Sequence, residues 1–259
     1  GGKIGEIRAV DGVSFTLRRG ETLGLVGESG CGKSTLGRAL NRLEEPTEGT
    51  VLFEGKDLAH ASGKELFRLR RDIQMIFQDP YSSLNPRMTI GEIVREPLLV
   101  HRVGNKAEQV EKVQELLEVV GLPGDTLGRY PHEFSGGQRQ RVGLARALTL
   151  EPKLVIADEP VSALDVSVQS QVLNLMVRLQ RERNLTYVFI SHDLSVVEYI
   201  SDTIAIMYLG RIVEVGPVET IFERAAHPYT RALIEAIPVP DPRRKHEGEP
   251  LKGEAPSPV

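Results

Sequence analysis

The sequence predicts an α/β fold, with a mainly parallel sheet and a helical segment inserted in its middle. Short apolar runs alternate with longer stretches in which apolar residues recur at helical spacing. This alternation is typical of βαβ units, whose parallel strands are buried on both faces. Between residues 89 and 150 the pattern is mostly helical, which indicates the insert.

The individual elements follow from these patterns and from the turn residues between them. We expect strands at residues 10–17, 22–26, 50–53, 73–77, 154–157 and 186–190, then a hairpin of 204–209 and 211–215 that turns at Gly210. Helices are expected at residues 33–43, 107–120 and 168–182, the last two with apolar residues along one face. Beyond Pro238, repeated prolines among charged residues predict an extended tail.

The composition is that of a globular protein without a nucleic-acid-binding surface. Of 259 residues, 40% are apolar and 26% charged, and the net charge is -4. Proteins that bind nucleic acid usually carry a clustered basic excess, so we expect no nucleic-acid partner. The single cysteine, Cys31, excludes an intrachain disulfide. No stretch approaches the roughly 18 consecutive apolar residues of a transmembrane helix, so a membrane role would require a partner.

A glycine-rich loop between an expected strand and an expected helix predicts a phosphate site. It reads Gly27-Glu28-Ser29-Gly30-Cys31-Gly32-Lys33-Ser34-Thr35 and fits the pattern G-x-x-x-x-G-K-[ST]. In such a loop, backbone N–H groups and the helix N-terminus surround phosphate oxygens. Lys33 would reach the outer phosphates, Ser34 would bind Mg²⁺, and Thr35 would contact an inner phosphate. A chance match in a chain of this composition is expected about 1% of the time.

Two carboxylates follow the expected strand at 154–157. A buried parallel strand delivers the residues after it to the ligand-binding edge of an open α/β sheet. We therefore expect Asp158 to hold Mg²⁺ and Glu159 to polarise an attacking water. A strand that ends in solvated acids is equally compatible with this pattern alone, and the functional interpretation depends on its pairing with Lys33.

Two further segments are candidates for the same chemistry. His192 follows the expected strand at 186–190, where a γ-phosphate would lie, although a lone histidine is more often structural. A second glycine-rich stretch, Ser135-Gly136-Gly137-Gln138, opens a helix and offers a hydroxyl and backbone N–H groups to an anion. By itself it would be interpreted as a helix N-cap. Cys31 is interpreted as a small packing residue, because no His-Asp arrangement would activate it.

Taken in order, these segments resemble the ATP-binding subunit of ABC transporters, from Val10 to about Ile237. The signature motif, Ser135-Gly136-Gly137-Gln138, is the most specific element of the resemblance, because many other P-loop ATPases have the remaining motifs without it. The motifs are the Walker A loop at 27–35, the Q-loop glutamine Gln78, the signature Ser135-Gly136-Gly137-Gln138, Walker B ending at Asp158-Glu159, the D-loop Ser162-Ala163-Leu164-Asp165 and the switch histidine His192.

The resemblance implies a P-loop NTPase core, with a RecA-like mainly parallel sheet and an antiparallel β subdomain. A helical subdomain is inserted into this core, and a short C-terminal extension follows it. The core would comprise residues 1–77 and 154–226, the helical signature subdomain 78–153, and the extension 227–259. An aromatic residue that usually stacks on adenine is missing, and the residue near its place is Ile4.

The resemblance also implies how the site is assembled. ATP would lie between Walker A of one subunit and the signature of its partner, so that binding closes a dimer and hydrolysis releases it. Residues 27–35, the signature and Asp165 would contact ATP, and Ser34, Gln78 and Asp158 would hold Mg²⁺. Glu159, His192 and Gln78 would have catalytic roles. Gln78 would also report the state of the γ-phosphate to the helical insert.

The implied partners are a second ATPase subunit, identical or homologous, and two transmembrane permease subunits. An extracytoplasmic solute-binding protein would act indirectly, and the chain would lie at the cytoplasmic face of the cell membrane. Residues 79–89, residues 227–233 and the proline-rich tail are similar to those of oligopeptide, dipeptide and nickel importers. Peptide import is the leading hypothesis, and import of nickel or another small solute is an alternative.

Two other classes of function are open to an ABC ATPase: translation or DNA repair, and nucleotide sensing without turnover. Translation factors usually carry two cassettes in one chain, and DNA-repair members insert a long coiled coil; here residues 46–134 are too short and too proline-broken for one. A nucleotide-sensing regulator would bind ATP without turnover, but Glu159 supplies the hydrolytic residue. The sequence therefore favours a transport ATPase.

Overall fold

A computed structural model describes residues 8–79 and 83–237 of the chain. These residues form two compact units. The first unit contains residues 8–17, 21–36 and 189–237, and the second contains residues 18–20, 37–79 and 83–188. Helix α1 (Lys33–Leu40) and strand β6 (Thr186–Ser191) each have residues in both units. In the described part of the chain, no helix has the length and apolar character needed to cross a membrane.

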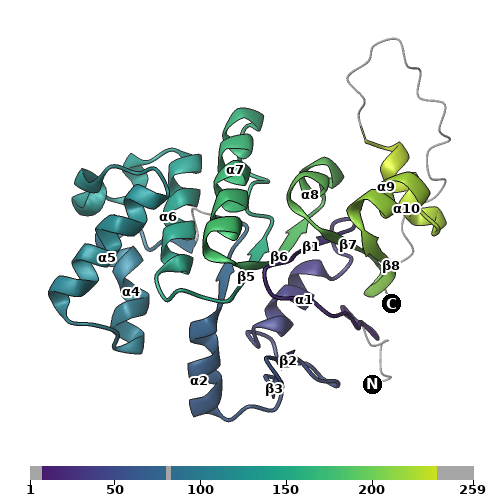
Figure 1. Cartoon of the computed structure of the whole chain (residues 1–259), viewed down its shortest axis with the longest axis horizontal. Helices are drawn as coiled ribbons and strands as arrows, with labels where there is room; N and C mark the ends of the chain where they lie inside the picture. Colours follow the sequence, from purple (N-terminus) through teal and green to yellow (C-terminus); the bar gives the residue numbers. More distant parts are fainter. Residues whose placement is uncertain (1–7, 80–82, 238–259) are drawn as a thin grey trace, which may run out of the picture. The chain divides into compact units, whose positions relative to one another are not determined.

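The first unit is built on the strands β1 (Thr22–Val26), β7 (Thr203–Tyr208) and β8 (Arg211–Pro217). β1 pairs with β7 in parallel, and β7 pairs with β8 antiparallel. Every residue of β1 is buried, as expected for a continuous apolar run in a parallel pair. The helices of this unit include α8 (Leu194–Ile200), α9 (Val218–Arg224) and α10 (Pro228–Glu235), labelled in Figure 1.

The second unit combines paired strands with a group of helices. β4 (Ile73–Ile76) and β5 (Leu154–Asp158) pair in parallel, and β2 (Leu52–Phe53) forms an antiparallel hairpin with β3 (Lys56–Asp57). Helices α4, α5 and α6 pack together in this unit (Figure 1). The helices are α2 (Gly63–Asp72), α4 (Ile90–His101), α5 (Lys106–Val119), α6 (Gly136–Leu148) and α7 (Val166–Arg183), with short 3₁₀ helices at Gly124–Gly128 and Pro131–Glu133.

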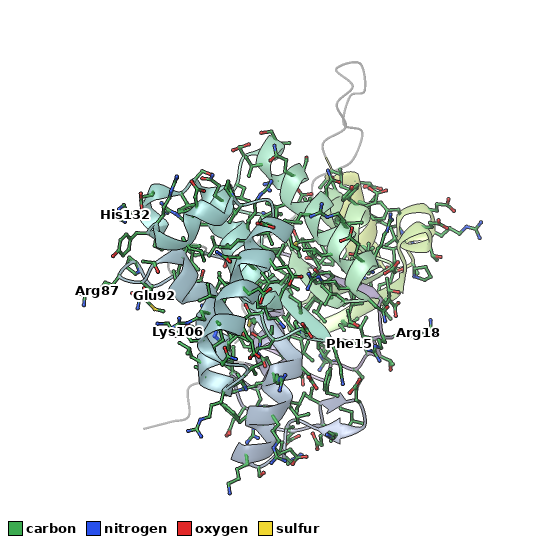
Figure 2. The ribbon with its side chains drawn as sticks, turned by 60° about the vertical axis from the view of Figure 1, so that its left-hand side comes forward. Phe15, Arg18, Arg87, Glu92, Lys106 and His132 are labelled. Carbon is green, nitrogen blue, oxygen red and sulfur yellow. The ribbon has the colours of Figure 1, made fainter. Side chains whose placement is uncertain are left out.

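The α-helices α2, α4, α5, α6 and α7 of the second unit begin at residues whose side chains cap free backbone N–H groups. At the start of α4, the Thr89 hydroxyl accepts from the Glu92 N–H at 3.3 Å, and the Glu92 carboxylate accepts from the Thr89 N–H at 2.8 Å. Asn105 and Glu108 form the same reciprocal pair at the start of α5. Figure 2 labels Glu92 and Lys106 in these first turns. Each cap stabilises its helix by about 0.5–2 kcal/mol, so these starts are fixed by local sequence.

The structure confirms the predicted α/β class and most of the predicted elements, with ends shifted by a residue or two. β7 and β8 form the expected hairpin, and its turn is at Leu209 and Gly210. Helix α1 ends at Leu40 rather than at residue 43, because Arg42 adopts a left-handed conformation (φ 49°) that turns the chain out of the helix.

One predicted strand is wrong. Residues 10–17 alternate between exposed and half-buried positions, but they form no hydrogen-bonded ladder with another described strand. Alternation of burial is therefore present without pairing to any strand among residues 8–79 and 83–237. The tail from residue 238, Ile4, and residues 80–82 of the segment at 79–89 lie outside the described residues.

Candidate functional site

The glycine-rich loop of the first unit joins β1 to α1 and surrounds the Lys33 side chain. Lys33 is the first residue of α1 and is only 4% exposed. Its Nζ donates to the carbonyl oxygens of Gly27 and Glu28, both at 2.8 Å. A buried ammonium group needs such acceptors to offset the loss of water. The loop thus places a cation beside the N–H groups of a helix start, an arrangement suited to phosphate.

Two glycines of this loop are required by close backbone approach. A Cβ on Gly27 would lie 2.1 Å from the carbonyl oxygen of Met207 in β7, and one on Gly32 would lie 2.0 Å from the carbonyl oxygen of Ala9. Both distances are far inside contact range, and the obstacles are backbone atoms that cannot turn aside. The motif glycines therefore keep the loop pressed against β7 and residue 9 within the first unit.

Cys31 packs inside the loop and is 6% exposed. Burial raises the pKa of its thiol, and the nearby Lys33 opposes this to a smaller extent. Because only the thiolate is a strong nucleophile, a raised pKa keeps the group unreactive at neutral pH. The geometry agrees with the interpretation of Cys31 as a packing residue.

In the second unit, the end of β5 presents the two predicted carboxylates. Asp158 is the last residue of β5 and is 3% exposed. Glu159 follows with φ of 45°, a left-handed conformation that costs a non-glycine residue about 1–3 kcal/mol. Gln78, which follows β4, donates from its side-chain amide to the Glu159 carboxylate at 2.9 Å. Two predicted catalytic residues that are far apart in sequence thus meet within one unit.

The signature and the D-loop also meet in the second unit. Ser135 caps α6: its hydroxyl accepts from the Gln138 N–H at 3.3 Å, and the Gln138 side chain accepts from the Ser135 N–H at 2.9 Å. A Cβ on Gly137 would lie 2.2 Å from the Val168 side chain, so the start of α6 packs tightly against the start of α7. Asp165 caps α7, and its hydrogen bond from the Ser167 hydroxyl lowers the pKa of the Asp165 carboxyl.

His192 follows β6 in the first unit and is exposed. The next residue, Asp193, caps α8 by accepting from the Ser195 N–H at 2.9 Å. The histidine is therefore held at a strand-to-helix junction, where its ring can meet a ligand. The sequence predicted this position after a strand, and the contact of His192 with a γ-phosphate stays a prediction.

Sequence reasoning missed one contact of the loop. The Tyr229 hydroxyl of α10 accepts a hydrogen bond from the Glu28 N–H at 3.2 Å. Tyr229 belongs to the segment 227–233 that resembles peptide importers, but the sequence suggested no role for it in the site. No periodic pattern links residues 28 and 229, so this contact could be found only from the three-dimensional structure.

Comparison with known proteins decides the family. The ABC transporter family matches residues 10–162, more than half of the chain, and the family described as the C-terminal region of oligopeptide/dipeptide transporters matches residues 213–259. The chain belongs to the ABC transporter family. This confirms the predicted family, and with it the predicted class of transport-coupled ATPase.

Curated relatives of this ABC protein are similar over nearly its whole length. The oligopeptide transport ATP-binding protein AppF of Bacillus subtilis is 58% identical over 260 residues, which cover 99% of this chain and 79% of AppF. OppF of the same organism, also an oligopeptide transport ATP-binding protein, is 58% identical, over 92% of this chain and 79% of OppF. A putative peptide import ATP-binding protein of Brucella ovis is 57% identical, over 98% of this chain and 80% of the relative.

Solved structures of ABC proteins confirm the predicted fold. The ATP-binding cassette MJ0796, solved as a dimer in a post-hydrolysis state bound to ADP and Pi, has a TM-score of 0.75 and 32% identity, covering 83% of this chain and 94% of that one. CbiO1 from Clostridium perfringens, part of the transporter complex CbiONQ, has a TM-score of 0.75 and 31% identity, covering 84% and 85%.

Proposed function

We propose that this chain is the ATP-binding and ATP-hydrolysing subunit of an ABC importer for oligopeptides. The observation that carries the proposal is the phosphate loop, in which a buried Lys33 is fixed by loop carbonyls at the start of α1. The names of AppF, OppF and the Brucella protein, together with the match at residues 213–259, support peptide as the solute class.

Within this proposal, each candidate residue has a separate task. The loop at residues 27–35 binds the phosphates of ATP, and Lys33 neutralises their charge. Glu159 polarises the attacking water, with its carboxylate oriented by the hydrogen bond from Gln78. His192 contacts the γ-phosphate. In this proposal, the loop at residues 27–35 binds ATP, and Glu159 is needed for its hydrolysis.

The residues proposed for Mg²⁺ are Ser34, Gln78 and Asp158. They offer hydroxyl, amide and carboxylate oxygens, which are the hard ligands that Mg²⁺ prefers. Asp158 is the last residue of β5, and residues at the carboxyl ends of parallel strands face the ligand in open α/β sheets. When bound, Mg²⁺ would neutralise charge on the phosphate oxygens of ATP.

The proposal includes assembly with other subunits. The signature, Ser135 to Gln138, and Asp165 complete the ATP site of a second ATPase subunit, identical or homologous. Two transmembrane permease subunits hold the pair at the cytoplasmic face of the cell membrane, and a solute-binding protein delivers the peptide from outside. The dimeric form of MJ0796 with its bound ADP and Pi supports the pairing.

Replacement of Lys33 tests the phosphate site. Because truncating one partner of a buried charged pair costs roughly 2–5 kcal/mol, Lys33→Ala should weaken Mg-ATP binding by at least about 30-fold. Titration calorimetry with Mg-ATP measures the affinity. Lys112→Ala is the matched control, because Lys112 pairs with Glu151 on the second unit and has no proposed role. Wild-type affinity in Lys33→Ala would contradict the assignment of the loop.

A further inference from the structure

Tyr229 connects helix α10 to the phosphate loop inside the first unit. Its hydroxyl accepts from the Glu28 N–H at 3.2 Å, and its side chain is buried, with 7% exposed. The Tyr229 ring packs against the ring of Tyr208 in β7, with centroids 4.4 Å apart. The hydroxyl is therefore presented to the loop from a side chain with little freedom to move.

The peptide group between Gly27 and Glu28 is held at both ends. Its carbonyl oxygen, on Gly27, accepts from the Lys33 Nζ at 2.8 Å, and its N–H, on Glu28, donates to the Tyr229 hydroxyl. A trans peptide points these two groups in opposite directions, so Tyr229 and Lys33 fix one plane between them. A rotation of this peptide would break both hydrogen bonds and take from the Lys33 Nζ one of its two carbonyl acceptors in the loop.

Helix α10 is itself anchored to the first unit. The Glu214 carboxylate of β8 accepts from the N–H groups of Ala226, at 2.7 Å, and His227, at 3.0 Å. His227 then caps α10 by accepting from the Tyr229 N–H at 3.2 Å. The sheet, the helix start and the loop thus form one connected set of contacts that ends at Glu28.

We infer that Tyr229 is a positioning residue for ATP binding, which orients the Gly27–Glu28 peptide and thereby Lys33. The inference rests on the proposed function of the loop. It gives the C-terminal segment at residues 227–233 a task at the nucleotide site that the sequence did not predict for it. Burial also raises the pKa of Tyr229 to about 12, so the hydroxyl stays neutral through the physiological range.

The paired variants Tyr229→Phe and Tyr208→Phe test this inference. Both remove one hydroxyl from the same ring pair, but only Tyr229→Phe removes the acceptor of the Glu28 N–H. Loss of that hydrogen bond should weaken Mg-ATP binding about three- to tenfold. Tyr208→Phe removes no contact of the loop, so its affinity should stay within about twofold of wild type. Calorimetric titration of the full chain with Mg-ATP measures both.

Two further readouts separate positioning from a general loss of stability. Hydrogen–deuterium exchange should accelerate at the loop peptide containing Glu28 in Tyr229→Phe alone, because its amide loses its partner. In the assembled transporter, the KM for ATP should rise in that variant while kcat changes less. The melting temperatures of the two variants should be alike.

Equal affinity of Tyr229→Phe and wild type would overturn the inference, and so would equal weakening in both variants. A wild-type chain that does not bind Mg-ATP would overturn the proposed function, and the inference with it. The two failures are distinguishable, because the first appears only in the variant and the second already in the wild type.

Discussion

At the scale of single residues, Glu159 shows how backbone and side chain together prepare a catalytic group. Its left-handed backbone is unfavourable for glutamate, yet it occurs directly after the buried strand β5. The carboxylate is held by Gln78, which follows the neighbouring strand β4. Strain at a site residue of this kind is tolerated only where the surroundings hold it, which fits the catalytic role proposed for Glu159.

Glu159→Gln should separate ATP binding from hydrolysis. Glutamine has nearly the same shape and can still accept from Gln78. The Mg-ATP affinity should therefore change by no more than about threefold, which is the effect of losing one weak hydrogen bond. It cannot polarise water as a base, so turnover should fall by about 100-fold or more. Phosphate release by the assembled transporter measures the turnover. Glu182→Gln, an exposed position on α7, is the control, and hydrolysis unchanged in Glu159→Gln would remove Glu159 from its proposed role.

At this scale, the sequence predicted where the candidate residues lie in their strands, loops and helices, but not which residues they contact. The loop residues, Asp158 and Glu159 were recognisable because motif and strand context are both local. The Gln78–Glu159 and Tyr229–Glu28 hydrogen bonds join residues that are 81 and 201 positions apart. Contacts at such separations follow from how strands and helices pack, and no local pattern encodes them.

At the scale of elements, helix α6 combines a structural start with a proposed ligand site. Ser135 and Gln138 form a reciprocal cap, and Gly137 lets the helix start approach Val168 of α7. The sequence predicted a helix start at this position, as it did for α5 and α7, since caps and helical spacing are local signals. It failed at residues 10–17, because a strand depends on a partner that the segment itself does not specify.

Ser135→Arg should impair hydrolysis at the ATP site that the signature completes. The bulky side chain would occupy the place proposed for the partner's ATP, while loss of the cap should destabilise α6 by only about 0.5–2 kcal/mol. Ser62→Arg is the matched control, because Ser62 is an exposed cap of α2 that accepts from the Glu65 N–H. We would measure ATP turnover and melting temperature for both variants in the assembled transporter. The two readouts separate a lost contact with the partner's ATP from a lost helix cap. Equal turnover in the two variants would show that the signature does not act in catalysis.

At the scale of the whole molecule, the chain carries the two proposed halves of a nucleotide site as separate features. The phosphate loop belongs to the first unit, and the signature lies at the start of α6 in the second. In the proposed assembly, each faces the complementary half of another subunit, with ATP between them. Binding of ATP then stabilises the association of the two subunits, and hydrolysis removes this stabilisation.

Whether two subunits share ATP is tested directly by the mass of the Glu159→Gln chain, measured by light scattering after gel filtration with and without Mg-ATP. It is measured for the chain alone and with the second ATPase subunit of its transporter. We expect an ATP-dependent complex of two ATPase subunits, either two copies of this chain or this chain with the second subunit, and we expect Ser135→Arg to abolish it. A Glu159→Gln chain that binds Mg-ATP but stays monomeric under both conditions would contradict the shared site.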